Sequence, residues 1–213
     1  MSDFKAALFD MDGTILDSMG VWADVDRVFF ARRGLSVPPS YALDIAGLSF
    51  RETAEYTIRA FGLPDAGEDV MNEWHELSEK AYSHDIRLKP YAREYLNKLK
   101  REGVKLAVAT ALTEKNYASA LKNNGVYDLF SAFASTEETE KGKSDGGVYL
   151  LAASRLGVPA AECRVFEDIY DGLAGAKRAN MTAAYVPDEW SRGDRARCEE
   201  IADIIVVSYK DLL

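Results

Sequence analysis

Six short apolar runs, separated by helical patterns, constrain the fold of this chain most strongly. The runs cover residues 4–9, 105–109, 131–135, 163–166, 182–186 and 203–207. Continuous apolar runs without alternation are typical of strands that are buried on both faces. The helical patterns between them cover residues 91–101, 114–123, 148–156 and 171–180. This order of elements predicts an α/β fold, a doubly wound, Rossmann-like parallel sheet with helices on both faces.

The segment that follows the first apolar run breaks this alternation. Its helical stretches cover residues 19–33, 49–61 and 69–82, with no convincing strand among them. In the first stretch, Val21, Val25, Val28 and Phe29 lie on one face at helical spacing. We therefore predict an α/β core domain of residues 1–17 plus 88–213 and an inserted all-helical cap domain of residues 18–87.

Composition excludes several classes of partner. The chain has 213 residues and a formal net charge of −9, which argues against a nucleic-acid partner because such proteins need basic faces. The two cysteines, Cys163 and Cys198, form no CxxC motif, which is typical of reduced thiols in the cytoplasm. No apolar run approaches the length of a membrane span. We expect a cytoplasmic protein without a membrane partner, as a monomer or a weak homo-oligomer.

Polar residues follow four of the predicted strands, where ligands bind in a parallel α/β sheet. They are Asp10 and Asp12 after the first strand, Thr110 after the second, Lys143 in the loop beyond the third, and Glu167, Asp168 and Asp171 after the fourth. Clustered carboxylates repel one another unless a hard cation lies among them, and Mg²⁺ prefers carboxylates, water and phosphate. A lysine and a hydroxyl add donors for phosphate oxygens. The set predicts phosphoryl transfer in which a carboxylate attacks phosphorus.

Four short motifs carry a resemblance to a known family. "DMDGT" at 10–14, Thr110 after "LAVA", "GK" at 142–143 and "FED" at 166–168 resemble the four motifs of the haloacid dehalogenase-like hydrolases. The helical insert after the first motif resembles the α-helical cap of the phosphoglycolate phosphatase and β-phosphoglucomutase branch. The resemblance covers nearly the whole chain, with the motifs in the family's order.

The resemblance implies a role for each matching residue. Asp10 would be the nucleophile, and Asp12 the general acid and base. Thr110 would bind the transferring phosphoryl group, and Lys143 would neutralise charge on the nucleophile and the phosphate. The implied Mg²⁺ ligands are Asp10, Asp12 through its backbone carbonyl, Asp168, and Glu167 beside them.

The chain departs from the family pattern at two places. Prolines usually follow the lysine of the third motif, whereas Ser144, Asp145 and two glycines follow Lys143 here. Lys141 is therefore an alternative to Lys143. Ile169 stands where a serine is common after the acidic pair, and this change leaves the charged ligands in place.

Two residues of the predicted cap are candidates for substrate contact. Trp22 lies at the edge of an apolar stripe, so it either packs in the cap or faces the site. Arg51 either contacts an anionic part of the substrate or is solvated. In the β-phosphoglucomutase group a histidine at the place of Trp22 helps to control the acid/base residue. Tryptophan there favours hydrolysis over a mutase reaction.

We expect a Mg²⁺-dependent phosphatase that hydrolyses a small phosphorylated metabolite through an aspartyl-phosphate intermediate. A sugar phosphate is one candidate substrate. Two alternatives stay open. A β-phosphoglucomutase-like phosphomutase would convert isomers and need a bisphosphate primer, and a non-catalytic metabolite-binding regulator would bind tightly without turnover.

Overall fold

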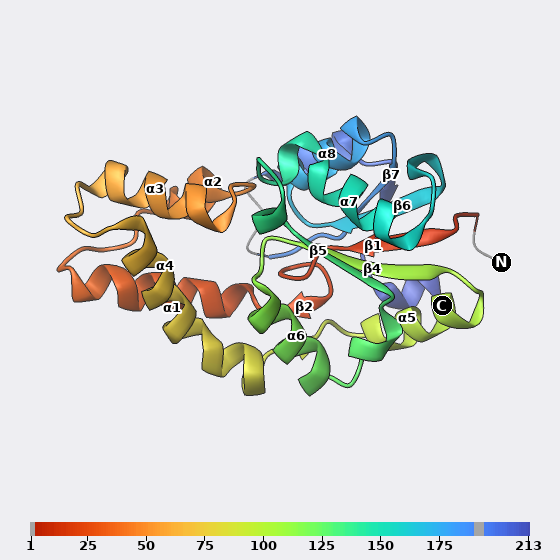
Figure 1. Ribbon diagram of the computed structural model, residues 1–213, viewed down its shortest axis with the longest axis horizontal. Helices are drawn as coiled ribbons and strands as arrows, with labels where there is room; N and C mark the ends of the chain where they lie inside the picture. Colours follow the sequence, from red (N-terminus) through yellow and green to blue (C-terminus); the bar gives the residue numbers. More distant parts are fainter. Residues whose placement is uncertain (1–2, 190–193) are drawn as a thin grey trace.

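The centre of the molecule is one sheet of six strands (Figure 1), in a computed structural model that describes residues 3–189 and 194–213. The strands are β1 (Ala6–Phe9), β4 (Lys105–Thr110), β5 (Ala132–Ser135), β6 (Cys163–Glu167), β7 (Thr182–Tyr185) and β8 (Ile204–Ile205). Their spatial order is β5-β4-β1-β6-β7-β8, and every neighbouring pair is parallel. The predicted parallel sheet is therefore confirmed. The chain builds outward from β1 through β4 to β5 and then returns to β6, so the carboxyl end of β1 lies at the topological switch point.

Helices cover both faces of the sheet, which explains why its strands are apolar without alternation. They are α5 (Ala92–Arg101), α6 (Glu114–Asn123), α7 (Gly147–Leu156), α8 (Tyr170–Arg178) and α9 (Arg195–Ile201). On one face, Ala7 and Phe9 belong to the apolar cluster that includes α5 and α6. On the other, Ala6 and Leu8 belong to the cluster that includes α7, α8 and α9. Because side chains alternate along a strand, both sets of β1 side chains are buried.

A segment of helices lies beside the sheet, between β1 and β4 in the sequence (Figure 1). It contains α1 (Met19–Arg32), α2 (Tyr41–Ile45), α3 (Phe50–Phe61), α4 (Gly67–Lys80) and the π-helix η1 (Ala81–Asp85). We call Met19–Asp85 the helical insert. Its α4 packs against α1 and α3. The insert has an apolar cluster of its own, made of Val25, Phe29, Phe30, Tyr41, Ala54, Val70 and Trp74. Its status as a separate domain with boundaries at residues 18 and 87 stays a prediction.

Two short strands join the helical insert to the sheet. They are β2 (Leu16–Asp17) and β3 (Arg87–Leu88), which pair in antiparallel fashion with Leu16 opposite Leu88. The outgoing and returning connections therefore run side by side. The sequence pattern does not predict this pair, because two-residue strands have no periodicity to detect.

Short 3₁₀ helices occupy several connections. They are η2 (Tyr127–Leu129), η3 (Thr136–Glu138), η4 (Lys143–Asp145), η5 (Ala160–Glu162) and η7 (Tyr209–Leu212). Two of them, η3 and η4, lie in the polar stretch that precedes α7. Among the described residues, no helix has the length and apolar character that a membrane span requires.

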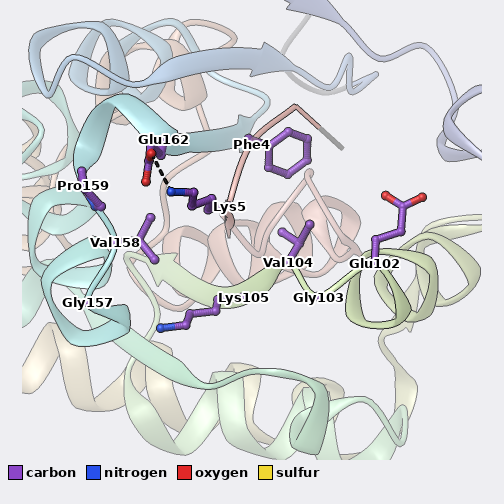
Figure 2. Close-up of a pocket in the computed structure, with 10 residues that line it drawn as sticks. All are labelled: Phe4, Lys5, Glu102, Gly103, Val104, Lys105, Gly157, Val158, Pro159 and Glu162. Atoms are coloured by element: carbon purple, nitrogen blue, oxygen red, sulfur yellow. Dashed lines mark hydrogen bonds and ion pairs between the residues drawn. The ribbon is translucent and has the colours of Figure 1, made fainter. Parts of the chain in front are cut away.

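A hollow of about 560 Å³ opens at the amino ends of β1 and β4 (Figure 2). The Lys5 and Glu162 side chains on its wall form an ion pair with a distance of 2.8 Å between Nζ and Oε1. Lys105 Nζ donates to the carbonyl oxygen of Leu156 at 2.7 Å. The hollow lies at the opposite end of the strands from the polar residues that the sequence places at their carboxyl ends. It is therefore separate from the candidate site.

Candidate active site

The carboxyl ends of β1 and β6 bring the predicted acids together. Phe9 at the end of β1 pairs with Phe166 in β6, and the backbone N–H of Asp10 donates to the carbonyl oxygen of Phe166 at 3.0 Å. This parallel register places Asp10 beside Glu167 and Asp168, although 157 positions separate Asp10 from Glu167 in the sequence. All three carboxylates are buried.

Lys143 enters this cluster from η4. Its Nζ lies 2.5 Å from Asp10 Oδ1 and 2.5 Å from Glu167 Oε1, and the residue is only 6% exposed. Burial alone would lower the pKa of Lys143, but the charges of Asp10 and Glu167 outweigh burial and hold this pKa above its usual value. Lys143 is therefore a cation in this site, whereas Lys141, the alternative from the sequence, is exposed.

The polar run after Lys143 positions this lysine without the usual prolines. Gly146 has a φ of +84°, a conformation that favours glycine, and it closes η4. Asp145 Oδ1 accepts a hydrogen bond from the backbone N–H of Gly147 at 2.9 Å. Arg178 in α8 donates to the carbonyl oxygen of Ser144. Hydrogen bonds within the loop and from α8 thus hold the loop in place.

Glu167 is fixed by hydrogen bonds to both of its carboxylate oxygens. Oε1 accepts from Lys143 and from the Tyr149 hydroxyl at 2.9 Å. Oε2 accepts from the backbone N–H groups of Asp168 at 2.9 Å and Ile169 at 3.2 Å. A fully buried carboxylate needs such partners. Glu167 thereby holds the ammonium group of Lys143 against Asp10.

The cluster suits a hard divalent cation. Asp10, Glu167 and Asp168 each offer a carboxylate oxygen, and these atoms lie within 4.8 Å of one another. Burial raises the pKa of Asp10 well above its usual value; Lys143 opposes this effect, and Glu167 and Asp168 add to it. Three buried carboxylate groups are thus within reach of one ion. Buried carboxylate oxygens of this kind are the ligands that Mg²⁺ prefers.

Asp12 lies at the edge of this cluster and accepts three hydrogen bonds from described residues. Ser18 Oγ donates to Oδ1 at 2.5 Å, Tyr82 Oη donates to Oδ1 at 2.7 Å, and Trp22 Nε1 donates to Oδ2 at 3.2 Å. Burial raises the pKa of Asp12, and these hydrogen bonds oppose the effect. Trp22 combines its two alternatives, because its ring packs against the apolar cluster of the insert while its indole N–H faces Asp12.

The remaining predicted residues differ in their placement. Thr110 is buried at the end of β4, where its Oγ1 accepts a hydrogen bond from the backbone N–H of Leu112 at 3.1 Å. The Thr110 hydroxyl proton is thus available to another acceptor. Arg51 is exposed in the first turn of α3 and makes no hydrogen bond or ion pair with a residue in the described ranges. Its side chain is therefore available to a ligand.

Sequence reasoning missed four residues that contact the predicted acids. They are Thr14, Ser18, Tyr82 and Tyr149. Thr14 Oγ1 lies 3.3 Å from both Asp10 Oδ2 and Asp168 Oδ1. Thr14 lies inside the first motif, and this position could have identified it as a residue of the candidate site. Tyr82 and Tyr149 lie far from the acids in sequence, and only the folded chain brings them close.

The helical insert touches the loop that carries Lys143. A Cβ atom built on Gly142 would lie 2.4 Å from the carbonyl oxygen of Gly47 and 3.1 Å from the backbone nitrogen of Ser49. Gly47 itself has a φ of +81°, and a Cβ there would lie 2.4 Å from Asp171 Oδ2. The two glycines allow the loop between α2 and α3 to approach the site closely.

Replacing Gly142 by alanine is expected to lower kcat/KM about tenfold, because the added methyl must push the insert loop away at a cost of about 1–3 kcal/mol. The matched control is Gly67→Ala in α4, where a Cβ meets nothing within 4 Å. Steady-state kinetics and thermal unfolding of both variants check this prediction. Equal activity in the two variants would show that the close contact has no part in turnover.

Comparison with known proteins identifies the family. The family model of the haloacid dehalogenase-like hydrolases matches residues 4–180. The chain belongs to this family. All four motifs that carry the resemblance in the sequence lie within the matched range, so the resemblance is confirmed.

Individual relatives match over most of their length. YhcW of Bacillus subtilis, a protein named as a phosphatase, is 33% identical over 187 residues, which are 87% of this chain and 84% of YhcW. The phosphorylated carbohydrates phosphatase of Thermotoga maritima is 27% identical over 181 residues, with coverage of 85% and 84%. The crystal structure of CbbY from Rhodobacter sphaeroides in complex with phosphate superposes with a TM-score of 0.86 at 24% identity, with coverage of 98% and 96%. This last likeness shows that the fold is shared over nearly the whole chain.

Proposed function

We propose that this hydrolase is a Mg²⁺-dependent phosphatase that acts on small phosphorylated metabolites through an aspartyl-phosphate on Asp10. The observation that carries the proposal is the contact of Lys143 with Asp10 beside the buried acids Glu167 and Asp168. The names of the relatives from Bacillus subtilis and Thermotoga maritima support phosphatase activity.

The chain's own residues supply the steps of the reaction. A carboxylate oxygen of Asp10 attacks phosphorus, the bond from phosphorus to the leaving oxygen breaks, and Asp12 donates a proton to that oxygen. Asp12 then takes a proton from a water molecule, which attacks phosphorus and releases phosphate from Asp10. Thr110 and Lys143 donate to the phosphoryl oxygens throughout.

The metal site would be built from residues of the same cluster. Asp10, Asp168 and the backbone carbonyl of Asp12 would hold Mg²⁺, with Glu167 beside them. When bound, the cation supplies positive charge that neutralises the phosphoryl oxygens and the attacking carboxylate. The three buried carboxylates, whose oxygen atoms lie within 4.8 Å of one another, support this assignment.

The substrate is proposed to bind between the sheet and the helical insert. We propose that residues 18–87 form a cap domain that excludes water over the site, and that Arg51 contacts a distal anionic or polar part of the substrate. The name of the Thermotoga maritima relative supports a sugar phosphate as substrate. The buried free thiols Cys163 and Cys198 support a reducing, cytoplasmic location.

Removal of the metal tests the proposal. Phosphate release from a panel of phosphorylated metabolites is expected to fall at least about 100-fold in EDTA and to recover when Mg²⁺ is added in excess. The panel ranks the substrates, and inclusion of bisphosphates with isomer analysis detects a mutase reaction. Full release in EDTA would contradict the metal requirement. Tight binding of a metabolite without any turnover would support the regulator instead.

A further inference from the structure

Tyr82 places its hydroxyl group between two residues of the candidate site. The Tyr82 ring is fully buried, and its Oη donates to Asp12 Oδ1 at 2.7 Å. The same Oη accepts a hydrogen bond from Trp22 Nε1 at 2.6 Å, and this single indole N–H is shared with Asp12 Oδ2 at 3.2 Å. A buried phenol hydroxyl needs a partner, and here both its donor and its acceptor capacities are used.

The backbone position of Tyr82 is unusual. It lies in η1, the π-helix that follows α4 on the returning connection from the helical insert to the sheet. Short π-helical segments occur frequently at functional sites. Trp22 lies in α1, on the outgoing side of the insert. Both sides of the insert thus contribute a hydrogen bond to the carboxylate of Asp12.

The hydrogen bonds distinguish the two oxygens of Asp12. Oδ1 accepts two short bonds, from Ser18 at 2.5 Å and Tyr82 at 2.7 Å. Oδ2 accepts a single bond among the described residues, the longer one of 3.2 Å from Trp22. Hydrogen bonds weaken with distance, so Oδ2 is the oxygen that is more easily released to exchange a proton.

We propose that Tyr82 is a positioning residue that anchors Oδ1 of Asp12 and so presents Oδ2 to the leaving-group oxygen of the substrate. This inference rests on the proposed phosphatase function, in which Asp12 protonates that oxygen. Tyr82 acts through Asp12 and does not touch the reacting phosphoryl group.

The test compares two leaving groups in wild type and Tyr82→Phe. An alkyl phosphate needs a proton on its departing alkoxide, whereas p-nitrophenolate departs without one. The Phe variant keeps the ring that packs against Trp22 and loses the hydroxyl. We expect kcat/KM to fall at least about tenfold for the alkyl phosphate, part of the 10²–10⁴-fold that general acid catalysis contributes, and to stay within about twofold for p-nitrophenyl phosphate. The ratio kcat/KM is used because it reports the steps up to departure of the leaving group.

Tyr41→Phe is the matched control. Tyr41 is also a buried tyrosine of the insert, and its hydroxyl lies 2.7 Å from Thr57 Oγ1, outside the candidate site. Its loss is expected to leave the ratio of the two substrates unchanged. A Tyr82→Phe variant that failed to fold would lose activity toward both substrates alike, and its circular dichroism spectrum would reveal the unfolding.

A second measurement places Tyr82→Phe in an Asp12→Asn background. If Tyr82 acts through Asp12, the tyrosine change then lowers kcat/KM for the alkyl phosphate by less than about twofold. An undiminished loss in this background, or an equal loss for both substrates in the single variant, overturns the inference. Absence of phosphate release from either substrate by the wild type would instead count against the proposed function itself.

Discussion

Replacing Asp10 by asparagine is expected to lower kcat for phosphate release by at least about 10³-fold, because the amide cannot attack phosphorus. The change keeps the size of the side chain and leaves Lys143 paired with Glu167, whose Oε1 lies 2.5 Å from Nζ. The fold is therefore expected to persist. Phosphate release and circular dichroism of the purified variant, measured in parallel, check both parts of the prediction.

The matched control for this experiment is Asp17→Asn. Asp17 is an exposed carboxylate in β2, a few residues further along the same segment. Its amide variant is expected to keep kcat within about twofold of wild type. Activity of Asp10→Asn that approached the level of Asp17→Asn would rule out Asp10 as the nucleophile.

Replacing Lys143 by methionine is expected to damage both stability and activity. Without the ammonium group, Asp10 and Glu167 become buried charges without their cation, a loss that costs about 3–5 kcal/mol of the free energy of unfolding. Since the lysine also neutralises phosphoryl charge, we expect kcat to fall at least about 10²-fold. Urea unfolding and steady-state kinetics measure the two effects, and Mg²⁺ is expected to restore part of the stability by binding the folded protein.

Lys141→Met distinguishes the two lysines of the loop. Lys141 is exposed, so its loss is expected to change the free energy of unfolding by no more than about 0.5 kcal/mol and to leave kcat within about twofold. If Lys141→Met and Lys143→Met lowered the free energy of unfolding and kcat equally, the proposed role of Lys143 in pairing with Asp10 would be contradicted.

The strands and the acids at their ends could be predicted because both depend on local sequence. A run such as Ala6–Phe9 is apolar on both faces, and this pattern indicates a covered parallel strand wherever it occurs. Once β1 and β6 are adjacent, the register of Phe9 with Phe166 brings Asp10 and Glu167 together. The sequence alone could thus place the centre of the candidate site.

The surroundings of Asp12 could not be predicted in the same way. Tyr82 is 70 positions away from Asp12, and it arrives through a π-helix and the two-residue strand β3. Neither element has a length or a period that a pattern can reveal. The direction in which Trp22 points was likewise open, because its place at the edge of an apolar stripe suits two orientations. Contacts between distant segments determine both the position of Tyr82 and the orientation of Trp22.

Direct detection of a phosphoryl group on Asp10 tests the central proposal most closely. Wild-type enzyme turning over its best substrate with Mg²⁺ is quenched in acid and digested, and its peptides are examined by mass spectrometry. We expect the mass of one phosphoryl group on the peptide that contains Asp10, assigned to that side chain by fragmentation and lost in Asp10→Asn or in EDTA. A phosphoryl group on a different residue during turnover would contradict the proposed role of Asp10.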